Sequence, residues 1–150
     1  MKNFLKFSVL FLFASFIFIS CEDDEEQEVT PEITNVVAEN HDGGTQIPRG
    51  GTISVNFDAK TRSGAKLDFY HIEIHDHPAS GAVEDEYKII DDDFKNLSTF
   101  KGLINAHVHE HIVVPDIANL GSYHVVIVVV DEDGNSTDTE TLETHVEIVE

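Results

Sequence analysis

Short stretches of β-forming residues, separated by turn-forming residues, fill the sequence from Ile33 onward. No long segment repeats apolar residues at a helical period. The separators, among them HDGG, PRGG and DEDGNS, are rich in glycine, proline, asparagine and aspartate. The expected strands cover residues 33–39, 52–59, 67–75, 86–90, 105–115, 122–131 and 142–149. This pattern predicts an all-β fold over residues 32–150, an immunoglobulin-like or fibronectin-III-like antiparallel β-sandwich of about seven strands.

Two segments of this plan need separate treatment. Residues 91–103 are expected to hold a short helical turn or an irregular crossing. The acidic turn after residue 130 contains Asp131, Asp133 and Asn135, which superficially resemble a calcium loop. An EF-hand loop needs glycine at its sixth position, whereas Gly134 is fourth here, so the sequence predicts a plain turn. The chain has no tryptophan and one cysteine, which excludes an antibody-type domain.

The N-terminal residues have the pattern of a secretory signal. Lys2 and Lys6 flank the start of an apolar run that ends at Cys21. The stretch FIFISC resembles the lipobox of bacterial lipoproteins, although Phe18 stands where leucine is usual. The resemblance implies cleavage before Cys21 and acylation of that residue, with residues 1–20 as a lipoprotein signal peptide. An ordinary signal peptide that happens to hold a cysteine is the alternative.

An acidic segment, residues 21–31, follows the cysteine and shows no apolar periodicity. Its like charges repel one another, so we expect an extended, lipidated tether. Acidic residues directly after a lipidated cysteine also resemble the surface-export signal of Bacteroidota lipoproteins. That resemblance implies an outer-membrane anchor with the domain exposed at the cell surface, and the periplasmic face is the alternative.

The charge of the chain narrows the choice of partners. Nine lysines and arginines stand against 29 aspartates and glutamates, a net charge of −20. Loss of residues 1–20 removes two lysines and leaves a net charge of −22. Such a surface repels a phosphate backbone, which argues against nucleic acid, and it attracts cations.

Three of the nine histidines occupy alternate positions of one expected strand. Side chains of a strand alternate between its two faces, so His107, His109 and His111 share one face of the strand 105–115. The same alternation places Glu110 on the apolar side, which indicates a bulge, an edge position or broken alternation there. A strand that only has to fold does not need three imidazoles on one face.

Topology suggests that other histidines join them. If the expected strands alternate up and down, the ends of the first, third and fifth strands and the start of the sixth lie at one pole. Five histidines that are far apart in the sequence then gather near that pole: His41, His75, His77, His111 and His124.

Imidazole binds zinc, copper, nickel and iron, and zinc needs three or four ligands about 2 Å away. Asp76 and Glu110 can add a ligand or orient a ring. We therefore predict a transition-metal site, for zinc or copper, that protons disrupt as the pH falls. Its predicted ligands are His75, His77, His107, His109, His111 and His124. The remaining histidines are interpreted as polar surface residues whose participation stays open: His41, His71 and His145.

The segments LDFYHIEIHDH, HEHIVVP and GSYHVVIVVVDEDGN together resemble a family of Bacteroidota lipoproteins with a histidine-rich, immunoglobulin-like domain of unknown function. The resemblance covers about residues 31 to 149. It implies that the residues shared with the family are His75 and His77, His109 and His111, and Tyr123 with His124. After His77, the residues PASGAVED replace a longer histidine-rich loop, which weakens the carry-over at His77.

Three functions compete at this stage. The first is a lipid-anchored protein of the cell envelope that captures or hands over zinc or copper, beside an outer-membrane transporter or another protein complex. The second is a non-catalytic interaction module of an outer-membrane complex. The third, a metalloenzyme, is disfavoured because no HExxH helix or nucleophile elbow occurs, and Ser80 and Ser122 have no identifiable base beside them. We therefore predict that the protein is not an enzyme.

Overall fold

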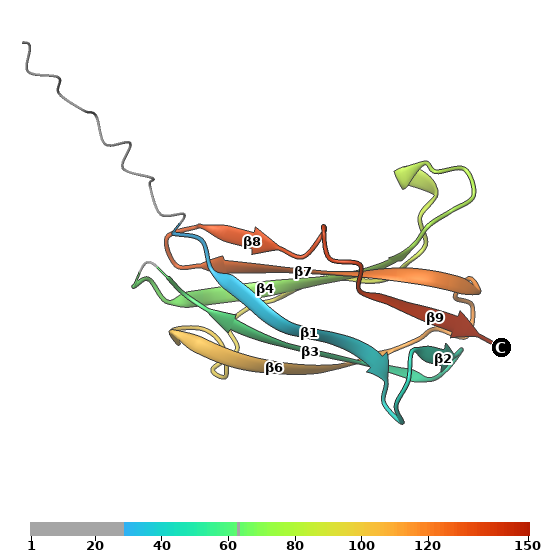
Figure 1. Ribbon diagram of the computed structural model, residues 1–150, viewed down its shortest axis with the longest axis horizontal. Helices are drawn as coiled ribbons and strands as arrows, with labels where there is room; N and C mark the ends of the chain where they lie inside the picture. The colour runs from blue at the N-terminus through green and yellow to red at the C-terminus, as the bar shows by residue number, and fades with distance from the viewer. Residues whose placement is uncertain (1–28, 63) are drawn as a thin grey trace, which may run out of the picture.

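The computed structural model describes residues 29–62 and 64–150 (Figure 1). The predicted signal peptide, Cys21 and most of the predicted tether lie outside these residues. The described part contains nine β-strands and one short 3-10 helix, η1 (Val83–Asp85), and none of its helices is long and apolar enough to cross a membrane. The strands are β1 (Glu32–Asn40), β2 (Gln46–Pro48), β3 (Thr52–Lys60), β4 (Leu67–Asp76), β5 (Lys88–Phe94), β6 (Asn105–Val113), β7 (Gly121–Asp131), β8 (Ser136–Asp138) and β9 (His145–Val149).

Two β-sheets lie face to face (Figure 1). Strands β1, β3 and β6 form a three-stranded antiparallel sheet in the order β1-β3-β6, called sheet A here. The other six strands form sheet B, in the order β2-β9-β7-β4-β5 with β8 paired to β7. The pairing of β2 with β9 is parallel, and the other described pairs of sheet B are antiparallel. The predicted all-β sandwich is confirmed.

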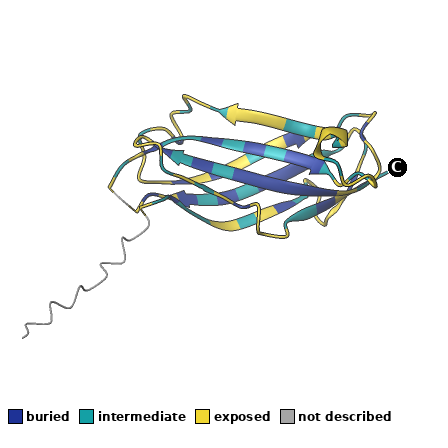
Figure 2. Ribbon diagram, turned by 90° about the horizontal axis from the view of Figure 1, so that it is seen from above, coloured by how far each residue is buried: buried dark blue, intermediate teal, exposed yellow. Residues whose placement is uncertain are grey.

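The core lies between the two sheets and is built mainly by the alternation of inward-facing apolar residues along the strands (Figure 2). Val55 and Phe57 of β3 face Ile72 and Ile74 of β4 across it, and all four are fully buried. Tyr70 is the aromatic centre of this core, with ring contacts to Phe57, Phe94 and Phe100. Because each strand turns one face inward, its polar residues are left on the outer faces of the two sheets.

Strand β5 extends beyond the predicted strand 86–90. Its acidic residues Asp93 and Asp91 pair with His71 and Glu73 of β4. Aspartate is generally disfavoured in β-strands. However, β5 is an edge strand of sheet B, where charged residues are tolerated and prevent the edge from pairing with further chains. Position at the edge therefore overrides the local propensity of these acidic residues.

The prediction of a helical turn or irregular crossing for residues 91–103 is accordingly wrong for the first four residues, which belong to β5. A short turn does follow, because the carbonyl of Leu97 accepts hydrogen bonds from the backbone N–H groups of Phe100 and Lys101. The strand count also differs from about seven, since the short strands β2 and β8 pair at the margins of sheet B. The expected strand 142–149 shrinks to β9.

Glu110 faces the core, as its parity requires, and β6 pairs with β3 without a register shift. Of the expected alternatives, the bulge is absent from β6, whereas the edge position is confirmed, because β6 is an edge strand of sheet A. The carboxylate is satisfied instead by Tyr70, whose hydroxyl donates a hydrogen bond of 2.5 Å to Glu110 Oε1. Burial, and after it this hydrogen bond, raise the pKa of Tyr70 well above its usual value. The bond joins β4 of sheet B to β6 of sheet A.

The turn after β7 is a plain turn, as predicted. The carboxylate of the buried Asp131 accepts hydrogen bonds from the backbone N–H groups of Asp133 and Asn135, at 3.0 and 2.9 Å. The side-chain amide of Asn135 donates to the same carboxylate. The acidic side chain at the head of the turn thus organises the backbone that follows it.

Candidate metal centre

The register of sheet B places three histidines in a row across three neighbouring strands. His75 of β4 lies directly opposite His124 of β7, and His124 lies directly opposite His145 of β9. Directly opposed residues share a face of the sheet and have neighbouring side chains. The rings confirm this, because the centroids of His75 and His124 are 5.5 Å apart and those of His124 and His145 are 4.9 Å apart.

The row lies on the outer face of sheet B, yet two of its members are buried. Ile74, Tyr123 and Val146, the sequence neighbours of the three histidines, all point into the core. His75 and His124 are nevertheless only 7% and 6% exposed. They are shielded by neighbouring side chains on the same face rather than by the opposite sheet. A buried imidazole usually has a hydrogen-bond partner or a metal ion. The burial of His75 and His124 therefore identifies this row as a candidate binding site.

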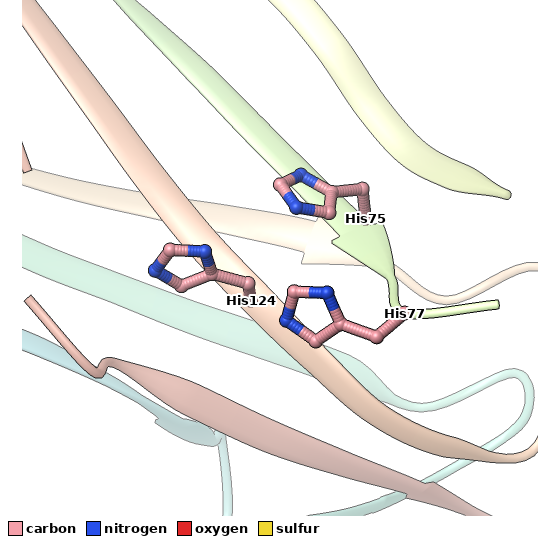
Figure 3. Close-up of side chains that lie close together, drawn as sticks. All are labelled: His75, His77 and His124. Carbon is pink, nitrogen blue, oxygen red and sulfur yellow. The ribbon is translucent and has the colours of Figure 1, made fainter. Parts of the chain in front are cut away.

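His77 completes the group from the residues that follow β4. Its exposed ring lies 5.5 Å from the ring of His75 and 5.9 Å from that of His124. Each of these three histidines offers one ring nitrogen to a set in which all nitrogens lie within 4.8 Å of one another (Figure 3). We call His75, His77 and His124 the sheet B triad.

The triad has the composition and the dimensions of a transition-metal site. Two nitrogens bound to one zinc ion at 2.0–2.1 Å in a tetrahedral arrangement lie about 3.4 Å apart. The nitrogens of the triad must therefore approach one another by at most about 1.4 Å for all three to bind one ion. His145 lies beside the triad, with its ring centroid 5.8 Å from that of His77. Three histidine ligands leave a fourth coordination position open.

One hydrogen bond selects the tautomer of His124. Its Nε2 lies 2.9 Å from the carbonyl oxygen of Leu142, and a carbonyl only accepts hydrogen bonds. Nε2 therefore carries the hydrogen, and Nδ1 of the neutral ring carries the lone pair that a metal needs. Metal-ligating histidines commonly donate from the second ring nitrogen in this way, which fixes the ring orientation.

His75 has a buried polar atom that the protein leaves unsatisfied. Its Nδ1 lies 3.0 Å from Glu73 Oε1, but no hydrogen bond of acceptable geometry reaches this nitrogen among the described residues. The same oxygen of Glu73 is 2.9 Å from the Lys88 ammonium. An unsatisfied buried nitrogen costs about 1–3 kcal/mol, so a ligand that reorients this ring would relieve a real penalty. This orphaned nitrogen fits a site that is completed by a cation.

The acidic and basic groups around Glu73 form a continuous network on the same face. Hydrogen bonds to Asp91 and then to Glu73 raise the pKa of Lys88, and the Lys88 ammonium lowers the pKa of Asp91. His71 lies between two carboxylates, with Nε2 3.2 Å from Asp91 and Nδ1 2.9 Å from Asp93. Two further groups of this network, His71 with Glu73 and Asp91, and Glu73 with His75 and Glu86, also have metal-binding dimensions. The sheet B triad differs from both in containing only imidazoles.

The three histidines of β6 lie elsewhere. His107, His109 and His111 are exposed on the outer face of sheet A, while Val108 and Ile112 of the same strand point into the core. His109 and His111 contact each other, and their ring centroids are 4.5 Å apart. His107 instead pairs with Asp58 of β3, with 2.8 Å between Nδ1 and Oδ1.

The five histidines expected near one pole divide into two contact groups on different sheets. His41 contacts His111 at a ring distance of 4.7 Å, whereas His75, His77 and His124 contact one another. The up-and-down argument located the strand ends along the sandwich but did not assign faces. A side chain at the end of a strand still points out of its own sheet, so the core separates the two groups.

The carboxylates expected to assist a metal hold the fold instead. Asp76 accepts hydrogen bonds from the Tyr87 backbone N–H, at 2.8 Å, and from the Asn119 side chain, at 2.7 Å. Glu110 lies on the core side of β6, as described above. The carboxylate beside the triad is Glu73, two positions before His75 on the same face of β4. That spacing was visible in the sequence, but nothing there showed that the outer face would be shielded at His75.

His145 is the histidine that sequence reasoning passed over. The sequence suggested a polar surface residue, because His145 is isolated in its strand. Its place beside His124 depends on the register between β7 and β9, which the intervening β8 and loop decide. No short-range signal encodes that register.

Comparison with known proteins identifies a family and a fold. The family described as "Domain of unknown function (DUF4625)" matches residues 19–149. A DUF4466 family protein from Parabacteroides merdae is 9% identical over 78% of this chain and 44% of its own length, with a TM-score of 0.50. The Pseudomonas fluorescens alkylpurine DNA glycosylase AlkC bound to DNA is 15% identical over 81% of this chain and 31% of its own, with a TM-score of 0.47.

A β-glucosidase from Listeria innocua is 11% identical over 80% of this chain and 16% of its own length, with a TM-score of 0.44. The chain thus spans less than half the length of these solved structures, and the likeness concerns the sandwich fold alone. No curated protein matches the chain.

Proposed function

We propose a metal-binding function for this chain, which belongs to DUF4625, a domain family of unknown function. The sheet B triad binds one divalent transition ion, zinc in the first place and copper in the second. The observation that carries the proposal is the convergence of three imidazoles, from β4, from the loop after it and from β7. One of them is the ring of His75, whose buried Nδ1 has no hydrogen-bond partner among the described residues. Imidazole is the side chain that binds these ions best at neutral pH.

Exposure and charge support capture or hand-over of the ion rather than a permanent structural site. His77 is exposed, whereas His75 and His124 are buried, so solvent reaches the triad from the side of His77. Three protein ligands leave one position for water or for a donor atom of a partner. The net charge of −20 raises the local concentration of cations. An outer-membrane transporter or another envelope protein is the partner that we propose, and we assign the chain no catalytic activity.

The proposed location rests on the N-terminal sequence. The lipobox-like stretch before Cys21 supports a lipid anchor, and the acidic residues after it support display from the outer membrane. A triacylated cysteine holds a domain firmly at a membrane, where a single chain does so only marginally. Metabolic labelling with a radioactive fatty acid tests the anchor, and a Cys21→Ser variant that still incorporates the label contradicts it.

Zinc titration tests the proposed function. The full-length chain, purified in detergent and stripped with a chelator, should bind one zinc equivalent in calorimetry at neutral pH. His124→Gln should weaken zinc binding at least about tenfold. Changing a group that only supports a metal ligand already lowers affinity about tenfold, so removal of a ligand should lower it at least as much. His71→Gln is the matched control, because it removes an imidazole from the same face of β4 while sparing the triad.

The two variants separate the possible outcomes. A flat thermogram for the unmodified chain contradicts the proposed function. A loss of binding in His71→Gln with none in His124→Gln moves the site to the group of His71, Glu73 and Asp91.

An interaction module without metal is the second candidate. Three exposed apolar side chains lie close together in the sequence at the end of β6 and in the loop before β7, namely Val113, Ile117 and Leu120, which are 66%, 79% and 47% exposed. Exposed apolar clusters commonly mark protein contacts. A membrane partner that co-purifies in the presence of chelator, and is lost from an Ile117→Ser variant, would favour this function.

A further inference from the structure

The outer face of sheet A carries a second pair of imidazoles whose nitrogens face each other. His109 and His111 are two residues apart on β6, so their side chains leave the same face of the strand. Their Nε2 atoms are 3.0 Å apart, and the two rings are nearly perpendicular. Two nitrogens at this distance either share one hydrogen or bind one cation.

The surroundings of His109 favour a lone pair at that point. The side-chain oxygen Oδ1 of Asn56 lies opposite His109 Nδ1 and can only accept a hydrogen bond. Nδ1 therefore carries the hydrogen, and Nε2 of the neutral ring points its lone pair at His111. Asn56 lies on the neighbouring strand β3, paired directly with His109, so the sheet register orients this ring.

A third imidazole comes from another part of the chain. His41 follows β1, and its backbone N–H donates a hydrogen bond of 3.0 Å to the carbonyl of Thr52. Its ring meets the ring of His111 edge-on, at a centroid distance of 4.7 Å. Its Nδ1 lies 3.3 Å from Ser54 Oγ, a long contact that leaves the ring available for another partner.

We propose that His109 and His111 form a second cation site, which takes Cu²⁺ in preference to Zn²⁺, and that the ring of His41 supports the site from beside His111. Two nitrogens bonded to one ion at about 2.0 Å lie about 2.8 Å apart at a right angle and about 3.3 Å apart at the tetrahedral angle. The observed 3.0 Å lies between these two values, so one ion can bind both nitrogens with little movement of the rings, in the square-planar or tetragonal geometry of copper sites as well as in a tetrahedral one. Copper also binds a given nitrogen site more tightly than zinc does.

The charge around the pair suits a divalent cation. Glu39 of β1 pairs with Ser54, which pairs with His111, so a carboxylate lies on the same row of sheet A. Asp58 lies two positions after Asn56 on the same face of β3. All three imidazoles are exposed, so the ion keeps water ligands at its open positions.

This second site does not depend on the sheet B triad. The two groups occupy the outer faces of opposite sheets, with the hydrophobic core between them. Their ligands come from different strands, and the ring contacts of each group remain within that group. The protein would therefore hold two ions on two separate surfaces.

Electron paramagnetic resonance with Cu²⁺ alone tests the site. The triad is first disabled in the full-length chain by His75→Gln with His124→Gln, because copper also binds there. This background should bind one copper equivalent, with the axial spectrum and nitrogen splitting of a tetragonal site. Adding His109→Gln and His111→Gln should remove that spectrum, and His41→Gln should weaken copper binding at least about tenfold.

His107→Gln is the matched control, since it removes a third imidazole from the same face of β6. Its copper spectrum and affinity should equal those of the background chain. The proposal is overturned if the His109 and His111 changes leave copper binding as strong as in this control, or if His107→Gln abolishes it. Circular dichroism confirms that each variant is folded, and His109→Gln with His111→Gln in the unmodified chain provides the same comparison if the background does not fold. Zinc titration of the unmodified chain reports the triad separately, so failure of one site does not mimic failure of the other.

Discussion

Sheet A and sheet B each present histidines on an outer face, but they bring them together in different ways. On sheet B, three imidazoles line up across β4, β7 and β9, and two of them are buried. On sheet A, the contacting pair His109 and His111 comes from a single strand and is exposed. Strands β4 and β7 have partners on both sides, whereas β6 is the edge of its sheet.

The difference shows what shields a side chain that points away from the core. A residue in the middle of a wide sheet is covered by neighbours on both flanking strands, while a residue on an edge strand has neighbours on one side only. The buried imidazoles of sheet B lose contact with water and need a partner to replace it. The exposed imidazoles of sheet A keep their contact with water, so the absence of a metal costs the folded protein little.

The largest effect on the stability of the metal-free protein is expected for the hydrogen bond between Tyr70 and Glu110, which joins sheet B to sheet A. Tyr70→Phe removes the hydroxyl that donates to Glu110, which lies between the two contacting histidines of β6. The free energy of unfolding should fall by about 1–3 kcal/mol, because a partly buried carboxylate loses its hydrogen bond. Urea unfolding measures this loss.

Tyr87→Phe is the control for that experiment, since the Tyr87 hydroxyl makes no hydrogen bond with any described residue. Its stability should change by no more than about 0.5 kcal/mol. Equal losses in the two variants would mean that the bond between the sheets contributes nothing. Zinc binding by the triad should persist in both variants, because neither touches the register of β4 with β7.

A smaller effect should separate the two histidine groups directly. In the presence of chelator, His75→Leu should raise the free energy of unfolding by about 1 kcal/mol, because it removes a buried nitrogen that lacks a hydrogen bond. His109→Leu, at an exposed position, should change it by no more than about 0.5 kcal/mol. Urea unfolding of both apo variants makes the comparison. A marked destabilisation by His75→Leu would show that its contact with Glu73 acts as a true hydrogen bond.

The smallest effect concerns the pKa of Asp58, a carboxylate on the outer face of sheet A. Hydrogen bonds from Asn35 and then from His107 lower the pKa of Asp58. A lowered pKa in the folded state means that this carboxylate stabilises the fold above its ordinary pKa, near 4, and that the contribution disappears as the pH falls further. Carbon-13 NMR titration of the carboxyl group should show the pKa of Asp58 rising more in Asn35→Ala than in His107→Ala. The reverse order would make the imidazole the main partner.

Much of the architecture was predictable because alternation is a local property. The expected strands 67–75 and 122–131 differ from β4 and β7 by one residue at one end. Parity alone also placed Glu110 on the core side of β6. Strand β5 was not predictable at its acidic end, since the aspartates are acceptable there only because the strand lies at an edge.

The candidate site was predictable in its parts and not in its assembly. His75 and His77 were expected ligands because of their spacing, and they lie together in the triad. His124 joined them through the topology argument. His109 and His111 came from the same reasoning but belong to the other sheet, and the relevance of His145 emerged only from the register of β9. Tertiary packing decides which sheet a strand joins, and therefore which outer face its histidines occupy. The alternation of residues along one strand does not predict this.

By itself, the sequence determined which side of each strand carries the histidines, because the period of two is a property of the extended backbone. It also determined the strong negative charge of the chain and the presence of side chains of the type that binds transition metals. Only the tertiary structure decided which strands became neighbours, and hence that His75, His77 and His124 meet while His109 and His111 remain apart from them. The physical reason is that pairing and layering depend on contacts between distant segments, whereas alternation depends on one residue and the next.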